Sequence, residues 1–152
     1  MNSNSQNISV IIPVYNSEDC LDELSRKLSG VLDSFGKVYE IILVNDCSQD
    51  NSWGKIIDLC GTNDNVKGIN LRKNFGVDNA IMAGVKYAQG KIIILMDDDL
   101  QHDPADIPTL ISGLNKGYDV CYANFTFMKQ SWLKNLGSWF NDKVANVILD
   151  KP

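Results

Sequence analysis

Residues 91–104 read KIIILMDDDLQHDP, and this stretch guides the interpretation of the whole sequence. An apolar, β-branched run suited to a buried strand passes directly into three consecutive aspartates. Adjacent carboxylates repel one another, and close packing would raise the pKa of at least one of them. A bound divalent cation would offset this repulsion, whereas an acidic turn in solvent would need no ligand. On this stretch alone, both interpretations stay open.

Four further apolar runs resemble the one that precedes the aspartates. They are ISVIIPV (8–14), YEIILV (39–44), VKGINL (66–71) and YDVCYA (118–123). Between the runs, apolar residues recur at helical spacing over 21–35, 53–60, 80–88 and 107–114. Crossovers of this length favour parallel strands, and continuous apolar runs suit strands that are covered on both faces. The sequence therefore predicts an α/β protein, a three-layer sandwich around a mostly parallel sheet.

The composition is that of a globular protein, with 152 residues of which 44% are hydrophobic and 22% charged. A net charge of −5 excludes general nucleic-acid binding, because no excess of basic residues is present to neutralise phosphates. No apolar stretch is long enough to cross a membrane, and the polar start lacks the pattern of a signal peptide, so we expect a cytoplasmic protein. The four cysteines are widely spaced, which predicts buried, reduced thiols.

The last part of the chain differs in charge from the rest. Residues 124–152 hold four lysines against two aspartates, which predicts a basic tail after a core domain of residues 1–123. A basic amphipathic helix over 129–149 could bind a membrane surface or promote self-association; alternatively, it could cover the sheet. The apolar stripe of this helix would consist of Trp132, Leu136, Trp139, Phe140, Val144, Val147 and Ile148.

Capping residues and polar loops mark the ends of the expected elements. Ser17, with Glu18 and Asp19 after it, predicts the start of the first helix, and Asp103 with Pro104 predicts the start of the last. Polar sequences follow the first four strands: VYNSE, NDCSQD, RKNFG and DDDLQ. In open parallel sheets ligands bind beyond the carboxyl ends of the strands, so these loops are the expected site.

The acidic loop offers oxygen ligands for a cation. In an extended segment alternate side chains share a side, so Asp97, Asp99 and Gln101 would point one way and Asp98 the other. Two carboxylates and an amide oxygen are hard ligands of the kind that Mg²⁺ or Mn²⁺ prefers, with positions left for water or a diphosphate.

Two other loops offer contacts to a nucleotide. Asp46, at the end of the second strand, could accept a hydrogen bond from a uracil or guanine edge, or it could cap its own turn. Arg72 and Lys73 could bind a diphosphate together with backbone N–H groups after NFG, or they could be ordinary surface charge. Base, phosphate and metal contacts at one sheet edge together favour a nucleotide site.

These motifs resemble those of family 2 glycosyltransferases with the GT-A fold, particularly the polyprenyl-phosphate, dolichol-phosphate mannose synthase-like branch. The similar segments are SVIIPVYNSE, EIILVNDCSQDNS, LRKNFGVDNAIMAG and GKIIILMDDDLQHDPADIP. The resemblance implies that Asp99 and Arg72 take part in catalysis. It assigns the nucleotide to Pro13, Tyr15, Glu18, Asp46, Arg72 and Asp97, and the Mg²⁺ or Mn²⁺ ion to Asp97, Asp99 and Gln101.

The function implied by the resemblance is metal-assisted, inverting transfer of a sugar from a nucleotide-sugar to a polyprenyl phosphate. A carboxylate at position 46 could serve uracil or guanine, and we favour UDP over GDP by a small margin. A phosphate acceptor is largely ionised at neutral pH, so it needs no base. Further motifs of the family would follow Pro152. We therefore expect a fragment of a longer enzyme that is weakly active or inactive alone, and a full-length protein at the cytoplasmic face of the membrane.

Two alternatives remain. A soluble family 2 glycosyltransferase that acts on a sugar or protein hydroxyl in polysaccharide synthesis would share the same donor motifs. A receiver-like signalling domain would also alternate strands and helices, but its acidic residues would follow the first and third strands, where this sequence has VYNSE and RKNFG.

Overall fold

The computed structural model describes residues 7–36 and 38–123. Its centre is a sheet of four parallel strands in the order β3-β2-β1-β4. The strands are β1 (Ile8–Val14), β2 (Tyr39–Asn45), β3 (Val66–Asn70) and β4 (Ile92–Leu95). Each corresponds to an apolar run of the sequence, so these four predicted strands are confirmed.

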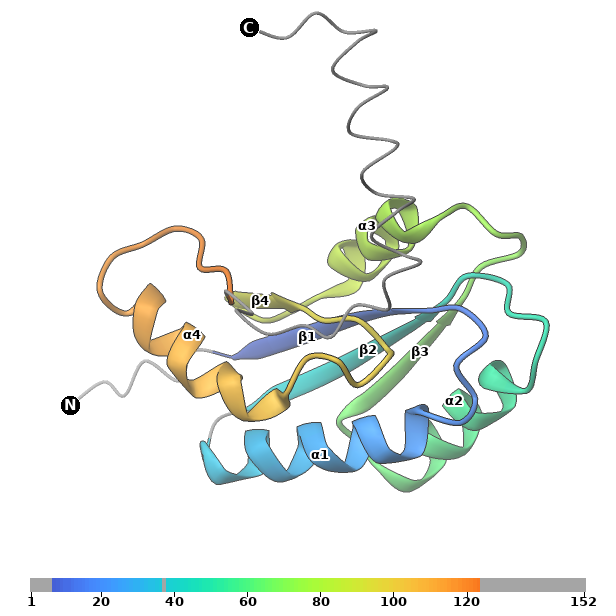
Figure 1. The fold of residues 1–152 in the computed structure, drawn as a ribbon, viewed down its shortest axis with the longest axis horizontal. Coiled ribbons are helices and arrows are strands. Elements are labelled where there is room, and N and C mark those ends of the chain that lie inside the picture. Colours follow the sequence, from blue (N-terminus) through green and yellow to red (C-terminus); the bar gives the residue numbers. More distant parts are fainter. Residues whose placement is uncertain (1–6, 37, 124–152) are drawn as a thin grey trace, which may run out of the picture. The chain divides into compact units, whose positions relative to one another are not determined.

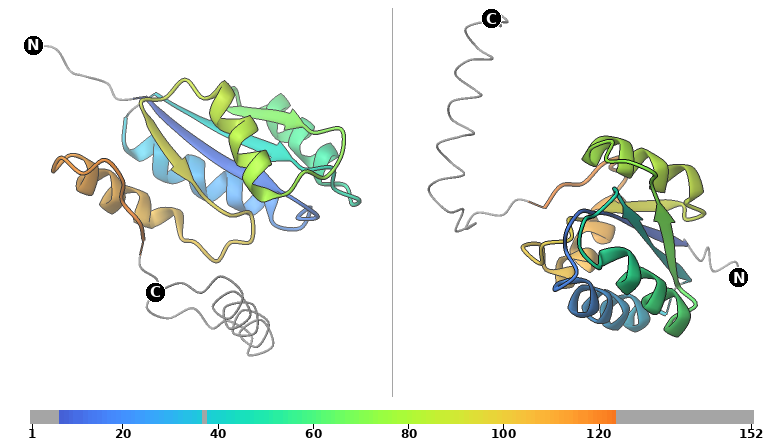
Figure 2. Two further views of the ribbon diagram at one scale, coloured as in Figure 1. Left: turned by 90° about the horizontal axis from the view of Figure 1, so that it is seen from above. Right: turned by 90° about the vertical axis from the view of Figure 1, so that its right-hand side faces the viewer.

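Helices cover both faces of this sheet (Figure 1). They are α1 (Leu21–Ser34), α2 (Ser52–Thr62), α3 (Val77–Tyr87) and α4 (Ile107–Leu114), with a short 3₁₀ turn, η1 (Pro104–Asp106), before α4. One core cluster joins α1, α2 and α4 to one face of the sheet, and a second joins α3 to the other. Seen from above, α3 lies on the opposite side of the strands from α1 (Figure 2). The predicted three-layer α/β sandwich is confirmed.

The two central strands are mostly apolar because both of their faces are buried. In β1, Val10 and Ile12 belong to the cluster with α1, while Ile11, between them, belongs to the cluster with α3. All three side chains are fully buried. Burying an aliphatic side chain of this size contributes about 1.5 to 3 kcal/mol, so these alternating contacts hold the three layers together.

The structure corrects the prediction of a fifth strand. Residues 118–123, which the structure describes, contain no strand, and Tyr118 and Val120 are 65% and 62% exposed. Within the described residues β4 pairs with β1 alone, and Ile93 and Leu95 of β4 are exposed. A β-branched, aromatic sequence forms a strand only when a neighbouring strand pairs with it, so composition alone was a poor guide here.

The predicted start of the first helix is wrong, whereas the predicted cap at Asp103 and Pro104 is confirmed for η1, which precedes the start of α4 at Ile107. α1 begins at Leu21 instead of after Ser17, because the polar groups of Ser17 and Glu18 bond to other loops. At the other helix, Asp103 accepts a hydrogen bond from the Ala105 N–H at 3.0 Å, and Pro104 follows as the first residue of η1.

Two expectations from composition can be compared with the described residues. The sequence predicted reduced, buried thiols. All four cysteines carry free thiols, but they are half-buried. A search of the described helices finds none with the length and apolar character needed to cross a membrane. The expected basic tail, residues 124–152, lies outside the described residues.

Gly84 shows how closely α3 packs on the sheet. A Cβ at position 84 would lie 2.4 Å from Cγ2 of Ile11, whereas one at Gly30 in α1 would meet nothing within 4 Å. We expect Gly84→Ala to lower the free energy of unfolding by about 1 to 3 kcal/mol through overpacking. The control Gly30→Ala should raise it by about 0.5 to 1 kcal/mol through helix propensity. Urea denaturation measures both, and stabilisation by both variants would contradict this packing.

Candidate nucleotide and metal site

The order of the strands places a crevice at the end of β1. The chain runs outward from β1 through β2 to β3 and then returns to the other side of β1 as β4. The loops after β1 and β4 therefore leave the sheet edge in different directions, which is where ligands bind in open α/β sheets. A cavity of about 290 Å³ lies at this edge.

The cavity brings together residues from all four strand-end loops. Of the eight residues predicted for the site, five line the cavity. The other three, Glu18, Arg72 and Gln101, do not. From the loop before α3 the sequence had singled out Arg72, Lys73 and the backbone N–H groups after NFG, whereas the residues of this segment that line the cavity are Asn74, Gly76 and Val77. The lining consists of Pro13, Val14 and Tyr15, then Asp46, then Asn74, Gly76 and Val77, and then Asp97, Asp98 and Asp99.

Asp98 connects the acidic loop to the loop after β1. Its Oδ2 accepts hydrogen bonds from the Tyr15 N–H at 3.1 Å and from the Ser17 hydroxyl at 2.5 Å. The sequence had assigned Asp98 only to the side away from the metal, so this bridging role was missed. Asp98 is thereby held against the loop after β1, whereas Asp97 and Asp99 make no such bond to another strand-end loop among the described residues and are the better candidates to bind a ligand.

The predicted alternation of side chains does not hold along the acidic loop. Leu100 has a left-handed backbone with φ of 58°, so the segment is not extended up to Gln101. The Gln101 N–H instead donates to Asp99 Oδ1 at 3.0 Å, which closes a tight turn. Asp97 lies 3.7 Å from Nδ1 of His102. The premise that placed Gln101 beside Asp97 and Asp99 is therefore wrong.

Asp46 holds the loop that precedes α3. Its Oδ1 and Oδ2 accept hydrogen bonds from the Phe75 and Gly76 N–H groups, each at 2.8 Å, and the residue is only 3% exposed. Gly76 has φ of 87°, a conformation that favours glycine, at the N-cap of α3. Both oxygens of Asp46 are thus engaged by backbone donors, so the carboxylate shapes the cavity wall.

The loops after β1 and β2 are tied to each other. Glu18 Oε2 accepts from the Asn51 N–H at 2.6 Å, and Asp50 accepts from the Glu18 N–H at 3.1 Å. Burial favours the neutral form of Asp50, but the hydrogen bonds from Ser52 and the Glu18 N–H outweigh it and lower the pKa of Asp50. Glu18, predicted as a nucleotide contact, here joins two loops beside the cavity.

The electrostatics of the cavity favour a cation. Its lining contains four aspartates, and among the described residues no lysine or arginine lines it. Burial, followed by the charge of Asp98 and nearby acids, raises the pKa of the Cys20 thiol, which keeps this neighbour protonated. A negatively charged diphosphate could enter such a cavity only if a cation came with it.

The donor set fits a hard divalent cation. Carboxylate oxygens are the ligands that Mg²⁺ and Mn²⁺ prefer. The described residues contain no group of three or more His, Cys, Asp or Glu side chains that could hold a metal. Asp97 and Asp99 would supply carboxylate ligands, and positions would be left to water and a ligand diphosphate.

The basic residues after β3 lie outside the cavity lining. Arg72 is exposed, and Nζ of Lys73 lies 4.7 Å from the centre of the Phe75 ring. A role for Arg72 at the phosphates or in catalysis stays a prediction from the sequence.

Comparison with known proteins agrees with this architecture. The sequence profile described as Glycosyl transferase family 2 matches residues 9–147. Similar solved structures include Staphylococcus aureus TarS 1-349 in complex with UDP-GlcNAc, with a TM-score of 0.57, 19% identity, and coverage of 82% of this chain and 38% of that one.

Two further structures show the same fold. Glucosyl-3-phosphoglycerate synthase from Mycobacterium tuberculosis, with Mn²⁺, UDP and glucosyl-3-phosphoglycerate, has a TM-score of 0.58, 19% identity, and coverage of 72% of this chain and 39% of that one. The mannosyltransferase PcManGT from Pyrobaculum calidifontis, with GDP-Man and Mn²⁺, has a TM-score of 0.53, 20% identity, and coverage of 65% and 29%. This chain thus spans less than half the length of each.

Proposed function

The chain belongs to glycosyl transferase family 2, and from this premise we propose that its cavity binds the nucleoside diphosphate of a nucleotide-sugar together with Mg²⁺ or Mn²⁺. The observation that carries the proposal is the cavity itself, which lies at the turning point of a parallel sheet and is lined by Asp46, Asp97, Asp98 and Asp99. In this proposal the cation binds both the cavity aspartates and the diphosphate, which allows an anionic ligand to occupy an acidic cavity.

Each lining carboxylate has a separate task in this proposal. Asp97 and Asp99 hold the cation, while Asp98 fixes their loop against the Tyr15 N–H and the Ser17 hydroxyl. Asp46 fixes the backbone of Phe75 and Gly76, in the loop that lines the cavity through Asn74 and Gly76. When bound, the cation stabilises the charge that develops on the departing nucleoside diphosphate.

The base of the nucleotide is proposed to be uracil. Two of the three similar structures contain UDP or UDP-GlcNAc, and the third contains GDP-Man. This supports UDP over GDP by a small margin. Tyr15, which is 48% exposed at the cavity, is available to pack against a base.

The acceptor is proposed to be a polyprenyl phosphate, with inversion at the sugar and a full-length enzyme at the cytoplasmic face of the membrane. The support is the resemblance of the segment from Asp99 to Pro104, DLQHDP, to that branch of the family. A phosphate monoester has a second pKa near 6, so it can attack the sugar as an anion without a protein base.

Titration calorimetry tests the donor site directly. With Mn²⁺ present, we expect UDP to bind more tightly than GDP, and we expect a chelator to weaken the binding of both strongly. Heat from UDP that is unchanged by chelator would contradict the role of the metal. If neither nucleotide binds in Mn²⁺ or in Mg²⁺, the proposed function is wrong.

A further inference from the structure

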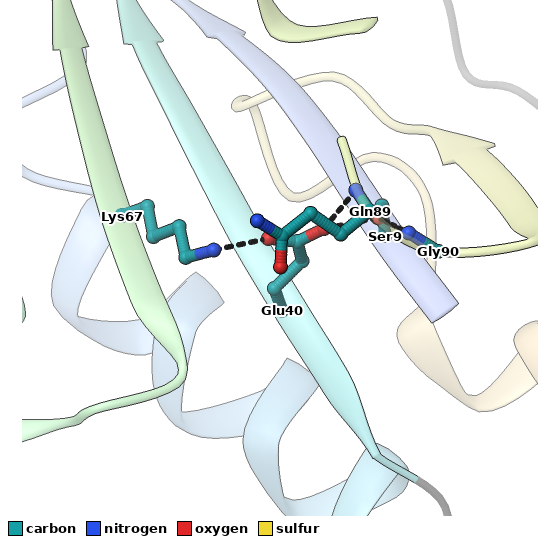
Figure 3. Close-up of polar contacts among 5 residues, drawn as sticks. All are labelled: Ser9, Glu40, Lys67, Gln89 and Gly90. Atoms are coloured by element: carbon teal, nitrogen blue, oxygen red, sulfur yellow. Dashed lines mark hydrogen bonds and ion pairs between the residues drawn. The ribbon is translucent and has the colours of Figure 1, made fainter. Parts of the chain in front are cut away.

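A buried carboxylate lies at the amino-terminal edge of the sheet, away from the cavity. Glu40, the second residue of β2, accepts hydrogen bonds from the Ser9 hydroxyl at 2.5 Å, the Gln89 N–H at 2.6 Å and Nζ of Lys67 at 2.7 Å (Figure 3). Its side chain is 9% exposed. Burial favours the neutral form, but these three donors outweigh it and lower the pKa of Glu40.

This cluster holds the loop between α3 and β4. The Ser9 hydroxyl oxygen accepts from the Gly90 N–H at 2.8 Å, next to the bond from the Gln89 N–H to Glu40 (Figure 3). The Asn7 carbonyl accepts from the Lys91 and Ile92 N–H groups at 2.9 and 3.2 Å. A Cβ on Gly90 would lie 2.5 Å from the Ser9 nitrogen, so the loop lies directly against the backbone of β1.

The loop adds to the restraints on β4 that come from its pairing with β1 and from the buried side chains of Ile92, Ile94 and Met96. The four residues of β4 pair with β1 from Ile92 to Leu95, and within the described residues β1 is its only partner strand. A slip of one residue along a strand moves every side chain to the other face. Since Asp97 follows β4 after one residue, such a slip would displace the carboxylates that line the cavity.

We propose that Glu40 is a positioning residue that fixes the register of β4 on β1, and through it the placement of Asp97, Asp98 and Asp99. Glu40 lies on β2 and accepts from Ser9 of β1, from Lys67 of β3 and from the Gln89 N–H in the loop before β4. One carboxylate therefore connects three strands to the loop that leads into the fourth. This inference rests on the proposed function for its binding readout, but its structural readout needs no ligand.

The test compares two destabilised variants. Glu40→Ala removes the acceptor, whereas Val66→Ala removes buried volume from β3, which does not pair with β4. Affinity for UDP in Mn²⁺ is measured at temperatures equally far below each melting point. We expect Glu40→Ala to weaken binding about tenfold or more through misplaced ligands. Val66→Ala should leave the affinity within about twofold, as a distant, independent site would.

Hydrogen exchange gives the readout that needs no ligand. The Tyr15 amide donates to Asp98 and the Met96 amide to the Ile11 carbonyl, so both report where the end of β4 lies. We expect both amides to exchange faster in Glu40→Ala than in Val66→Ala. Equal exchange in the two variants would overturn the inference, even if the wild-type chain bound no nucleotide and the proposed function had failed.

A second variant covers the case in which Glu40→Ala does not fold. Ser9→Ala removes the acceptor of the Gly90 N–H and leaves Glu40 with its other two donors. We expect the same faster exchange at Tyr15 and Met96, to a smaller extent. Unchanged exchange at both amides in Ser9→Ala would show that the loop contact does not position β4.

Discussion

Replacing Asp99 with alanine is expected to weaken UDP binding in Mn²⁺ by about 100-fold, the upper end of the loss seen when a partner of a metal ligand is removed. The expected reason is that, within the described part of the chain, Asp99 accepts only one hydrogen bond, at Oδ1, and keeps Oδ2 for a cation. Both oxygens of Asp46 accept backbone donors, and Oδ2 of Asp98 accepts two donors of the loop after β1. In chelator, where the cation is absent, wild type and variant should bind equally weakly. Calorimetric titration under the two conditions measures the difference.

Two controls separate metal binding from other effects of this change. Asp99 Oδ1 also accepts from the Gln101 N–H, and Asp99→Asn retains an oxygen for that bond while removing the charge. Asp99→Asn should therefore still lose most of the Mn²⁺-dependent affinity. Asp106→Ala removes an exposed carboxylate of η1, outside the cavity lining, and should have little effect. Equal losses for Asp99→Ala with and without Mn²⁺ would contradict the metal-ligand role.

Strands were predictable where burial alone decides their conformation. The run from Ile8 to Val14 is apolar at consecutive positions because helices cover both faces of β1, and the sequence shows this directly. The run at 118–123, YDVCYA, also contains residues that favour strands, yet it forms no strand in the described structure. Pairing depends on a neighbour that is distant in sequence, and no local pattern reports whether one is present.

The gathering of carboxylates at one sheet edge was predictable, but their hydrogen-bond partners were not. The carboxylates gather at one edge because the ends of parallel strands meet there, which the alternation of strands and helices already implied. What each carboxylate binds depends on loop conformation. The left-handed backbone of Leu100 breaks the alternation that was expected to place Gln101 on the same side as Asp97 and Asp99. A leucine at that position does not predict this conformation.

The hydrogen-bond partners of Asp46 could not be predicted from the sequence either. At the end of a strand its carboxylate could equally accept from a nucleotide base or from the backbone, and the choice depends on the loop from Asn74 to Gly76. That loop is remote in sequence but brings two N–H groups to within 2.8 Å of the two oxygens. The structure thus favours a task for Asp46 that is complete before any ligand binds.

Replacing Asp46 with alanine is therefore expected to destabilise the ligand-free protein. Two hydrogen bonds to a buried carboxylate would be lost, each worth about 1.5 kcal/mol or more, for a total of about 3 kcal/mol. For a chain of this size that corresponds to a melting temperature lower by roughly 10 °C. UDP affinity should fall as well, because Gly76 and Val77 of the released loop line the cavity. Thermal denaturation and calorimetric titration measure the two effects.

Asp46→Asn distinguishes the backbone contact from a base contact. An asparagine has one oxygen acceptor, so it can keep one of the bonds to Phe75 and Gly76 while its NH₂ group opposes the other donor. If Asp46 acts as a clamp on the backbone of Phe75 and Gly76, Asp46→Asn should lose about half as much stability as Asp46→Ala. The Phe75 and Gly76 amides should then exchange faster in Asp46→Asn than in the wild type, without any nucleotide. If Asp46→Ala kept wild-type stability and slow exchange at both amides but lost affinity for UDP, the carboxylate would act on the base, and the clamp would be wrong.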